Sequence, residues 1–353
     1  MTSPTLTPKG FLIYTQAAIL IVAALYFAKA LLIPMSYALL LSVILFPLCK
    51  KLERRGCPRA LSITIALLLV TLLFIALLAL LVVEINLFTQ DLPALRQKLL
   101  IAIPNFQKWL SDTLGISLQL QHNWWQEAVF NLLRNPGDLI RNTISATAET
   151  FVTLFLIPIY TALFLYNRTV FVRFLVRITP ADYKERLPQI LEKATGTYSK
   201  FIKGMLFVYL IVGTLNSIGF FLLGIEHAIL FGTLTALLTI IPYVGIIISS
   251  LLPITVAWLT KDSIWFPVGV IGVLAFVQYL EANIIFPKVV GSQLNISTWA
   301  VLVAVIAGGM LWGISGMILF IPFVAILKII FEQFPAGRVF NILLARGGIS
   351  GES

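Results

Sequence analysis

The sequence predicts an all-α membrane protein that crosses the bilayer several times. Hydrophobic residues make up 59% of the 353 positions and charged residues only 11%, whereas soluble domains carry about 25% charged residues. Long apolar runs alternate with short basic loops, and a span needs roughly 20 apolar residues. We therefore expect a polytopic protein with roughly six to eight transmembrane segments, including two broken or re-entrant helical hairpins, plus a small helical exterior segment.

Residues 1–88 are expected to form an N-terminal transmembrane scaffold. The predicted spans are Gly10–Ile33, Met35–Leu48 and Leu61–Phe88. Pro34 separates the first two, because proline lacks a backbone N–H and disrupts a helix. The loop Cys49–Arg59 holds five basic residues against one acid. Since short basic loops remain in the cytoplasm, this loop predicts a cytoplasmic N-terminus.

Residues 89–149 are expected to form an extracytoplasmic helical segment. Five basic and five acidic residues balance there, unlike in the basic loops. Pro93, Pro104 and Asn135-Pro136-Gly137 predict a series of short amphipathic helices with breaks between them. Trp124 and Trp125 are typical of a membrane interface.

Residues 150–203 predict a transmembrane helix followed by a cytoplasmic amphipathic helix. The span is Thr150–Tyr166, and Arg168–Lys203 then carries eight basic residues against three acids. Thr179 and Pro180 have the pattern of a helix start, with Thr as N-cap and Pro at the first helical position. Apolar residues at helical spacing follow from Leu187. We expect this helix to lie on the membrane or on a neighbouring subunit.

Residues 204–334 are expected to form the permease core, and residues 335–353 a cytoplasmic tail. The core begins with the span Met205–Leu223, in which Asn216 is a polar residue expected to face the protein interior. Residues 228–259 and 299–331 are too long for one span and too short for two. Each has a central Pro or Gly break, and paired interrupted segments indicate the discontinuous helices of a transporter site. Long, tilted, kinked helices are the alternative.

Glu281 is an ionisable residue inside an apolar run that begins near Ile264. An acid inside a membrane segment is costly and usually functional, or else paired. Gln278 lies one helical turn earlier on the same face. Pro287 removes a backbone donor and is expected to free the carbonyl of Asn283. The alternative is that Glu281 and Lys288, seven residues apart, form an ion pair that only locks helices together.

Several functions and sites are disfavoured by the motifs. The chain has no P-loop, no dinucleotide fingerprint and no H-E-x-x-H motif. Its two His and two Cys residues make a metal site improbable, and its net charge of +10 lies in scattered loops, which disfavours nucleic acid as a partner. One enzyme alternative stays open, because Gly313-Ile314-Ser315-Gly316 matches the nucleophile motif of rhomboid-type intramembrane proteases. Such a serine needs a base, and His227 is the only membrane-adjacent His.

Three stretches together resemble the autoinducer-2 exporter-type permease family, also called AI-2E. They are Pro242-Tyr243-Val244-Gly245, then Glu281-Ala282-Asn283 with Pro287-Lys288-Val289-Val290-Gly291, then the glycines from Gly308 to Gly316 before Pro322. The layout of spans and loops is also similar, so the resemblance covers almost the whole chain. The positions that match the family motif are Pro242, Tyr243, Gly245, Glu281, Asn283, Pro287, Lys288, Gly291, Gly308, Gly309, Gly313 and Gly316.

The resemblance implies an ATP-independent exporter of a small polar signal in the bacterial inner membrane, and thus a role in quorum sensing. It also implies a homo-oligomer whose core moves like an elevator against a scaffold. No cofactor is implied. Other family members are described as sodium/proton antiporters or broad permeases, so the family alone does not fix the substrate.

We expect the substrate or ion pathway to use the motif residues together with Gln278, with Asn216 as a further polar group. The tips Pro242–Gly245 and Gly308–Gly316 are predicted to meet near Glu281. Tyr243 and the glycine-rich tip would contact the substrate, and Glu281 would bind the solute or a coupling ion. The alternatives are a Na⁺ or Li⁺/H⁺ antiporter, an intramembrane serine protease, and a membrane scaffold.

Overall fold

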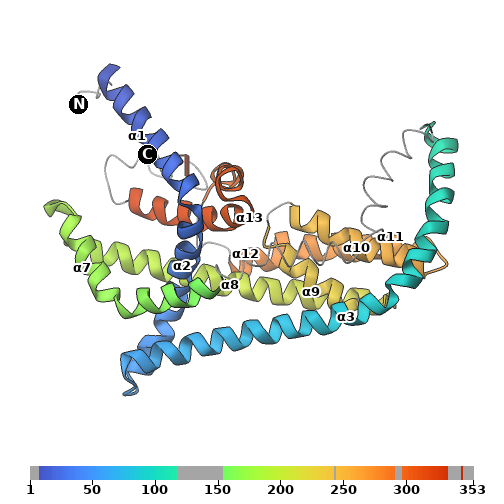
Figure 1. The fold of residues 1–353 in the computed structure, drawn as a ribbon, viewed down its shortest axis with the longest axis horizontal. Coiled ribbons are helices and arrows are strands. Elements are labelled where there is room, and N and C mark those ends of the chain that lie inside the picture. Colours follow the sequence, from blue (N-terminus) through green and yellow to red (C-terminus); the bar gives the residue numbers. More distant parts are fainter. Residues whose placement is uncertain are drawn as a thin grey trace. The chain divides into compact units, whose positions relative to one another are not determined.

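The computed structural model describes residues 8–115, 117, 154–241, 244–290, 296–332 and 343–344 (Figure 1). The regular elements across these ranges are helices, which confirms the predicted all-α class. The chain divides into two compact units. The first unit contains Met1–Leu67, Val152–Phe201 and Gln293–Ser353; the second contains Leu68–Phe151 and Ile202–Ser292.

Five helices in the described part of the chain are long and apolar enough to cross a membrane. They are α2 (Lys29–Glu53), α3 (Arg59–Leu114), α8 (Leu187–Leu222), the run Trp265–Val289 and α13 (Thr298–Phe331). A sixth span results if the bent pair Leu154–Tyr166 and α7 (Arg168–Ile178) counts as one. The chain is therefore a multi-pass membrane protein, as the composition predicts.

Prolines fall inside helices at three places where breaks were expected. The boundary between α1 (Pro8–Phe27) and α2 lies at Ala28, and Pro34 is within α2. Likewise, α3 continues from Arg59 to Leu114 through Pro93 and Pro104, so the short helices expected in this part of the exterior segment are wrong. The end of the membrane span at Phe88 stays a prediction. Proline bends a helix and removes one hydrogen bond, but the helix continues where the surroundings compensate for that loss. Residues 118–150 of the expected exterior segment lie outside the described residues.

The expected amphipathic helix is the beginning of a longer one. It starts at Leu187, after a 3₁₀ turn at Ala181–Tyr183, and continues without a break to Leu222 as α8. Thr179 ends α7 and does not cap a new helix. Three apolar residues of the first part of α8, Ile190, Tyr198 and Phe201, are buried within the chain itself. This face is therefore already covered, so the prediction that it rests on lipid or a neighbouring subunit is wrong.

Helices α9 (Ala228–Leu238) and α10 (Val244–Thr260) form the first predicted hairpin, within the second unit. Eleven residues at 1.5 Å each make α9 only about 16 Å long, roughly half of the 30 Å hydrocarbon core. Gly245 lies against the carbonyl of Leu238, and a Cβ at this position would clash with it. The absence of a side chain at Gly245 thus allows the two arms to approach each other.

Helix α13 contains the second predicted hairpin, within the first unit. Its helical geometry stops at Trp312 and Gly313, and Gly313 has φ 59° and ψ −139°, which is essentially a glycine-only conformation. Gly308 and Gly316 touch through their backbones across this break. In a straight helix eight residues advance about 12 Å, so this contact shows that the chain turns back. Both broken hairpins predicted from the Gly and Pro pattern are confirmed.

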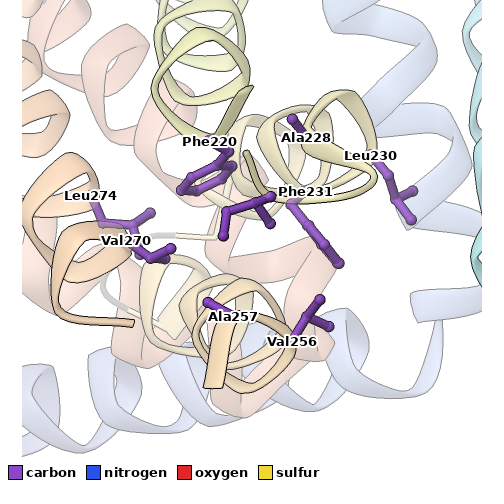
Figure 2. Close-up of a cluster of buried hydrophobic side chains, with 9 residues drawn as sticks. Phe220, Ala228, Leu230, Phe231, Val256, Ala257, Val270 and Leu274 are labelled. Atoms are coloured by element: carbon purple, nitrogen blue, oxygen red, sulfur yellow. The ribbon is translucent and has the colours of Figure 1, made fainter. Parts of the chain in front are cut away.

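The core of the second unit joins four helices and is shown in Figure 2. Phe220 comes from α8, Phe231 from α9, Ala257 from α10, and Val270 from α11 (Trp265–Leu280). The apolar faces of these helices meet in one buried cluster, and burying a large aliphatic or aromatic side chain contributes about 1.5–3 kcal/mol. The cluster holds the α9–α10 hairpin against α8 and α11, the two helices that carry the candidate site.

The two units do not coincide with the expected scaffold and core. Helix α13 groups with α1 and α2 because it packs directly against both. Helices α9 to α12 group with the second parts of α3 and α8. Which parts move during transport, as scaffold and core, stays a prediction.

Candidate functional site

A π-helical turn lies at the centre of the candidate site. Residues Glu281–Ile285 form this turn, named η3, between α11 and α12 (Phe286–Val289). The N–H of Phe286 donates to the carbonyl of Glu281, five residues earlier. Pro287 follows immediately and has no N–H to continue the pattern. Such π turns insert one extra residue into a helix and are frequent at functional sites.

The Glu281 side chain is half-buried, and its Oε2 atom is fully buried. Among the described residues no donor is placed to hydrogen-bond this oxygen. Tyr209 of α8 lies close enough for the charge of Glu281 to act on it. A buried carboxylate oxygen without a donor is unfavourable, so the site is poised to accept a proton, a cation or a hydroxyl group.

Two glycines of α8 allow close packing on either side of Glu281. A Cβ at Gly204 would lie 2.9 Å from the carbonyl oxygen of Val289, and one at Gly219 would clash with Val273. Gly219 thus meets α11 and Gly204 meets α12, with Tyr209 and Glu281 between these contacts. The order shows that α8 runs antiparallel to the α11–η3–α12 run. Small residues permit such close approach of helices in membranes. The close approach of α8 to the α11–η3–α12 run brings Tyr209 near Glu281.

Asn216 is a second buried polar group on α8, as expected for a polar residue of a span. Its side chain is only 1% exposed, and its Nδ2 donates to the carbonyl of Val212 at 3.0 Å. Its Oδ1 is buried and has no donor among the described residues. In the described part of the second unit, Asn216 and Glu281 thus each have a buried side-chain oxygen that lacks a hydrogen-bond donor.

The other predicted residues of this segment are placed differently. Gln278 is half-buried one turn before Glu281. Asn283 is exposed, and its Nδ2 donates to the carbonyl of Tyr279 at 2.9 Å. Pro287 and Lys288 are exposed. Of this group, only Gln278 shares the partly buried environment of Glu281.

The alternative in which Glu281 pairs with Lys288 is wrong. The ion pairs of the described residues do not include one between these two side chains. Seven residues make two α-helical turns and would place both groups on one face. The π turn between them adds a residue and rotates Lys288 away from that face. The turn therefore leaves the Glu281 charge without this partner.

The glycine-rich tip of α13 is fixed within the first unit. The Nε1 of Trp312 donates to the carbonyl of Leu25 in α1 at 2.9 Å, and the hydroxyls of Tyr37 and Ser315 interact. Trp312 also packs edge-to-face on Phe320, with ring centroids 5.5 Å apart. Gly309 faces the flexible end of Met317. The tip is thus a defined turn whose conformation is stabilised by contacts of aromatic residues.

Three predicted pathway residues, Pro242, Tyr243 and Gly291, lie outside the described residues. The predicted meeting of the two hairpin tips near Glu281 stays a prediction. Tyr209, Tyr37 and Trp312 were not identified from the sequence. A polar group within an apolar span was the available signal for Tyr209, as it was for Asn216.

A polar cavity lies elsewhere in the second unit. Nε2 of His227 and Oδ2 of Asp91 are 2.8 Å apart, and His227 begins α9 with a left-handed φ of 57°. The adjoining cavity has a volume of about 130 Å³ and is lined by Phe88, Asp91, Ala94, Leu95, Lys98, Glu226, His227, Val256 and Thr260. His227 is thus engaged by an acid of α3. The described residues contain no group of three or more His, Cys, Asp or Glu side chains suited to hold a metal ion.

Comparison with known proteins decides the family. The model of AI-2E family transporters matches residues 16–336 of this chain. The chain belongs to the AI-2E transporter family. The match covers both hairpins and the Glu281 turn, so the resemblance expected from the motifs is confirmed.

Individual AI-2E relatives share about a quarter of their residues with this chain. YueF of Bacillus subtilis (strain 168) is 29% identical over 324 residues, which cover 86% of this chain and 84% of YueF. YhhT of Escherichia coli (strain K12) is 26% identical over 356 residues, covering 98% and 96%. The AI-2 transport protein TqsA of Escherichia coli (strain K12) is 25% identical over 356 residues, covering 98% of each chain. The coarse function follows from the family, since this AI-2E protein is a membrane transporter of small solutes.

Proposed function

We propose that this AI-2E protein is an ion-coupled secondary transporter that exports a small polar solute similar to autoinducer-2. The observation that carries the proposal is the Glu281 carboxyl group at the π turn of an apolar segment, whose buried Oε2 has no donor within the part of the chain that the structure describes. An unpaired charge at such a place is unfavourable, so a proton, a cation or a hydroxylated solute stabilises it. When an ion and a solute bind to the same acid in turn, the flux of one is coupled to the flux of the other.

The groups around Glu281 suit a solute that carries hydroxyl groups. Gln278 offers an amide and Tyr209 a hydroxyl, and Pro287, two residues after the π turn, cannot donate to a backbone carbonyl. A few polar groups among apolar side chains are typical of small-molecule sites. Tyr243 and the tip glycines Gly308, Gly309, Gly313 and Gly316 complete the pathway in this proposal. TqsA, named as an AI-2 transport protein, supports a solute of this class.

The proposal also includes location and assembly. Lys50 and Lys51 lie in the last turn of α2, and Arg59 begins α3, so the region where these helices meet is basic. By the positive-inside rule we expect this region to face the cytoplasm, and we propose that both termini lie on the same side. We expect a homo-oligomer in the bacterial inner membrane, with a core that moves against a scaffold.

A Na⁺ or Li⁺/H⁺ antiporter is the second candidate. The observation in its favour is that two buried oxygen atoms, Oε2 of Glu281 and Oδ1 of Asn216, have no donor among the residues that the structure describes. Carboxylate and amide oxygens are ligands of hard cations. An antiporter would move protons against the cation and would need no organic solute.

We infer that the chain is not an enzyme. Ser315 interacts with Tyr37, and His227 pairs with Asp91, so each of the two protease candidates has another partner. A serine nucleophile requires a base within hydrogen-bonding reach. Absence of labelling of Ser315 by a serine-reactive phosphonate is the expected result.

Flux measurements in proteoliposomes test the proposal. Vesicles loaded with a labelled autoinducer-2-like solute and a pH-sensitive dye are prepared with wild type, Glu281→Gln and the exposed control Glu192→Gln. Solute efflux that only Glu281→Gln loses is the expected result. Cation-driven proton flux without solute efflux would favour the antiporter. If a folded protein moves neither, the proposed ion-coupled export of such a solute is wrong, and the membrane-scaffold alternative is favoured.

A further inference from the structure

Helix α7 is an 11-residue helix with no buried residue, and its two faces differ sharply. Thr169, Arg173 and Arg177 recur every four residues and share one face. The opposite face carries Phe171, Phe174, Leu175 and Ile178, at the spacing of an apolar stripe. Phe174 is 59% exposed and Ile178 60% exposed. The helix contains no acidic residue.

The beginning of α7 is fixed to the basic end of the first unit. Arg168 forms an ion pair with Glu53 at the end of α2, and its guanidinium lies 5.2 Å from the centre of the Phe46 ring. Arg59 at the start of α3 donates to the carbonyl of Leu165 at 3.0 Å. These contacts place the start of α7 at the end of unit 1 where α2 ends in Lys50 and Lys51.

The direction of α7 and the orientation of its apolar face follow from the preceding span. The helix bends by 67° from Leu154–Tyr166, so it leaves the span at a steep angle (Figure 1). Phe171 packs against Phe164 of the span, with ring centroids 5.3 Å apart. The face that carries Phe171 is therefore turned back toward the apolar span, and the face with Arg173 and Arg177 is turned away from it.

We propose that α7 is an interfacial helix that binds the surface of a leaflet rich in anionic phospholipid. Its apolar face enters the boundary between head groups and acyl chains, and Arg173 and Arg177 bind lipid phosphates. A helix with one apolar face, arginines on the other and no acid has the composition of membrane-surface helices. Arginine suits phosphate because its planar guanidinium donates two parallel hydrogen bonds. Anionic lipid is the partner whose charge complements this helix.

Fluorescence quenching in the full-length protein tests the position of the two faces. In a Cys49→Ala, Cys57→Ser background, an environment-sensitive dye is attached at Phe174→Cys, or at Thr169→Cys as the opposite-face control. The vesicles contain phosphatidylglycerol and a lipid with a nitroxide near the head of its acyl chain. We expect the nitroxide to quench the dye at position 174 several-fold more than at 169, and aqueous iodide to show the reverse order.

Variants that change the charge of α7 test whether the helix prefers anionic lipid. Arg173→Gln with Arg177→Gln should weaken nitroxide quenching at position 174 in anionic vesicles, and Arg173→Lys with Arg177→Lys should restore most of it. Higher salt should weaken the charge-dependent part. Size-exclusion profiles in detergent report that each variant is folded. A dye at 174 that iodide quenches freely would overturn the proposal, and so would one shielded from both quenchers, since another protein surface would then cover this face.

Discussion

The indole Nε1 of Trp312 donates a hydrogen bond of 2.9 Å to the carbonyl oxygen of Leu25. Trp312 is at the turn of the α13 hairpin, and Leu25 is in the last turn of α1. Carbonyls in the last turn of a helix lack an intrahelical partner, so the indole satisfies a group that would otherwise be unpaired. One bond thus joins the hairpin turn to the first helix across 287 positions of sequence.

Trp312→Phe should destabilise the first unit by about 1 kcal/mol, because it removes an interhelical hydrogen bond but keeps an aromatic ring. Trp299→Phe is the matched control, since Trp299 belongs to the same helix and is 57% exposed. The free energy of unfolding in mixed micelles is the measurement. Equal values for the two variants would contradict the stabilising role of the Leu25 contact.

The hairpin turn should also depend on its glycines to different degrees. Gly316→Ala places a Cβ against the carbonyl of Gly308, whereas Gly309→Ala meets only the flexible end of Met317. Backbone cannot yield as a side chain does, so we expect about 1–3 kcal/mol of destabilisation for Gly316→Ala and much less for Gly309→Ala. Gly272→Ala in α11, where the space is open, is the control. Thermal midpoints in detergent report the order, and a Gly309→Ala midpoint at or below that of Gly316→Ala would contradict the close packing.

The Gly and Pro residues of the sequence predicted the hairpin turns correctly but did not predict where a long helix continues. Gly313 marked a real turn, because its backbone conformation is one that other residues avoid. Pro93 and Pro104 suggested breaks that do not exist, since a long helix tolerates a proline with a kink. Whether a proline ends a helix depends on tertiary surroundings that its neighbours in sequence do not specify.

The candidate site was predictable as to its acid but not as to its partners. Glu281 stood out because an acid in an apolar run is rare. The alternative in which Glu281 pairs with Lys288 was wrong, since the helical period changes at the π turn. Tyr209 lies 72 positions earlier, and only the packing of Gly204 and Gly219 brings it near. Such long-range contacts follow from helix packing, which periodicity does not reveal.

Tyr209→Phe should reduce transport, because it keeps the ring and removes the hydroxyl on which the charge of Glu281 acts. We expect this hydroxyl to donate to the acid or to the solute during the transport cycle. A hydrogen bond to a charged group contributes about 1.5–3 kcal/mol, so its loss predicts a flux reduction of about tenfold or more. Tyr279→Phe is the control, since Tyr279 is 61% exposed on the helix that carries the acid. Initial efflux rates from proteoliposomes are compared at equal protein density. A Tyr209→Phe rate equal to that of Tyr279→Phe would remove Tyr209 from the site.

Glu332, just beyond α13, makes the stability of the first unit depend on pH. Burial raises the pKa of its carboxyl group, but hydrogen bonds and charge from Lys193 and Lys328 outweigh this, so the net pKa is lowered. A carboxyl group with a lowered folded-state pKa stabilises the fold above its unfolded pKa of about 4.3, and this stabilisation is lost as pH falls through the folded value.

Lys328 is only 3% exposed, so Glu332→Gln leaves a buried cation unpaired and should cost about 1–3 kcal/mol at neutral pH. Thermal unfolding is measured from pH 7 to pH 3. The difference in thermal midpoint between wild type and Glu332→Gln should disappear below about pH 4, while the exposed control Glu192→Gln follows wild type throughout. A difference that stays constant over this range would mean that the ion pairs of Glu332 do not stabilise the fold.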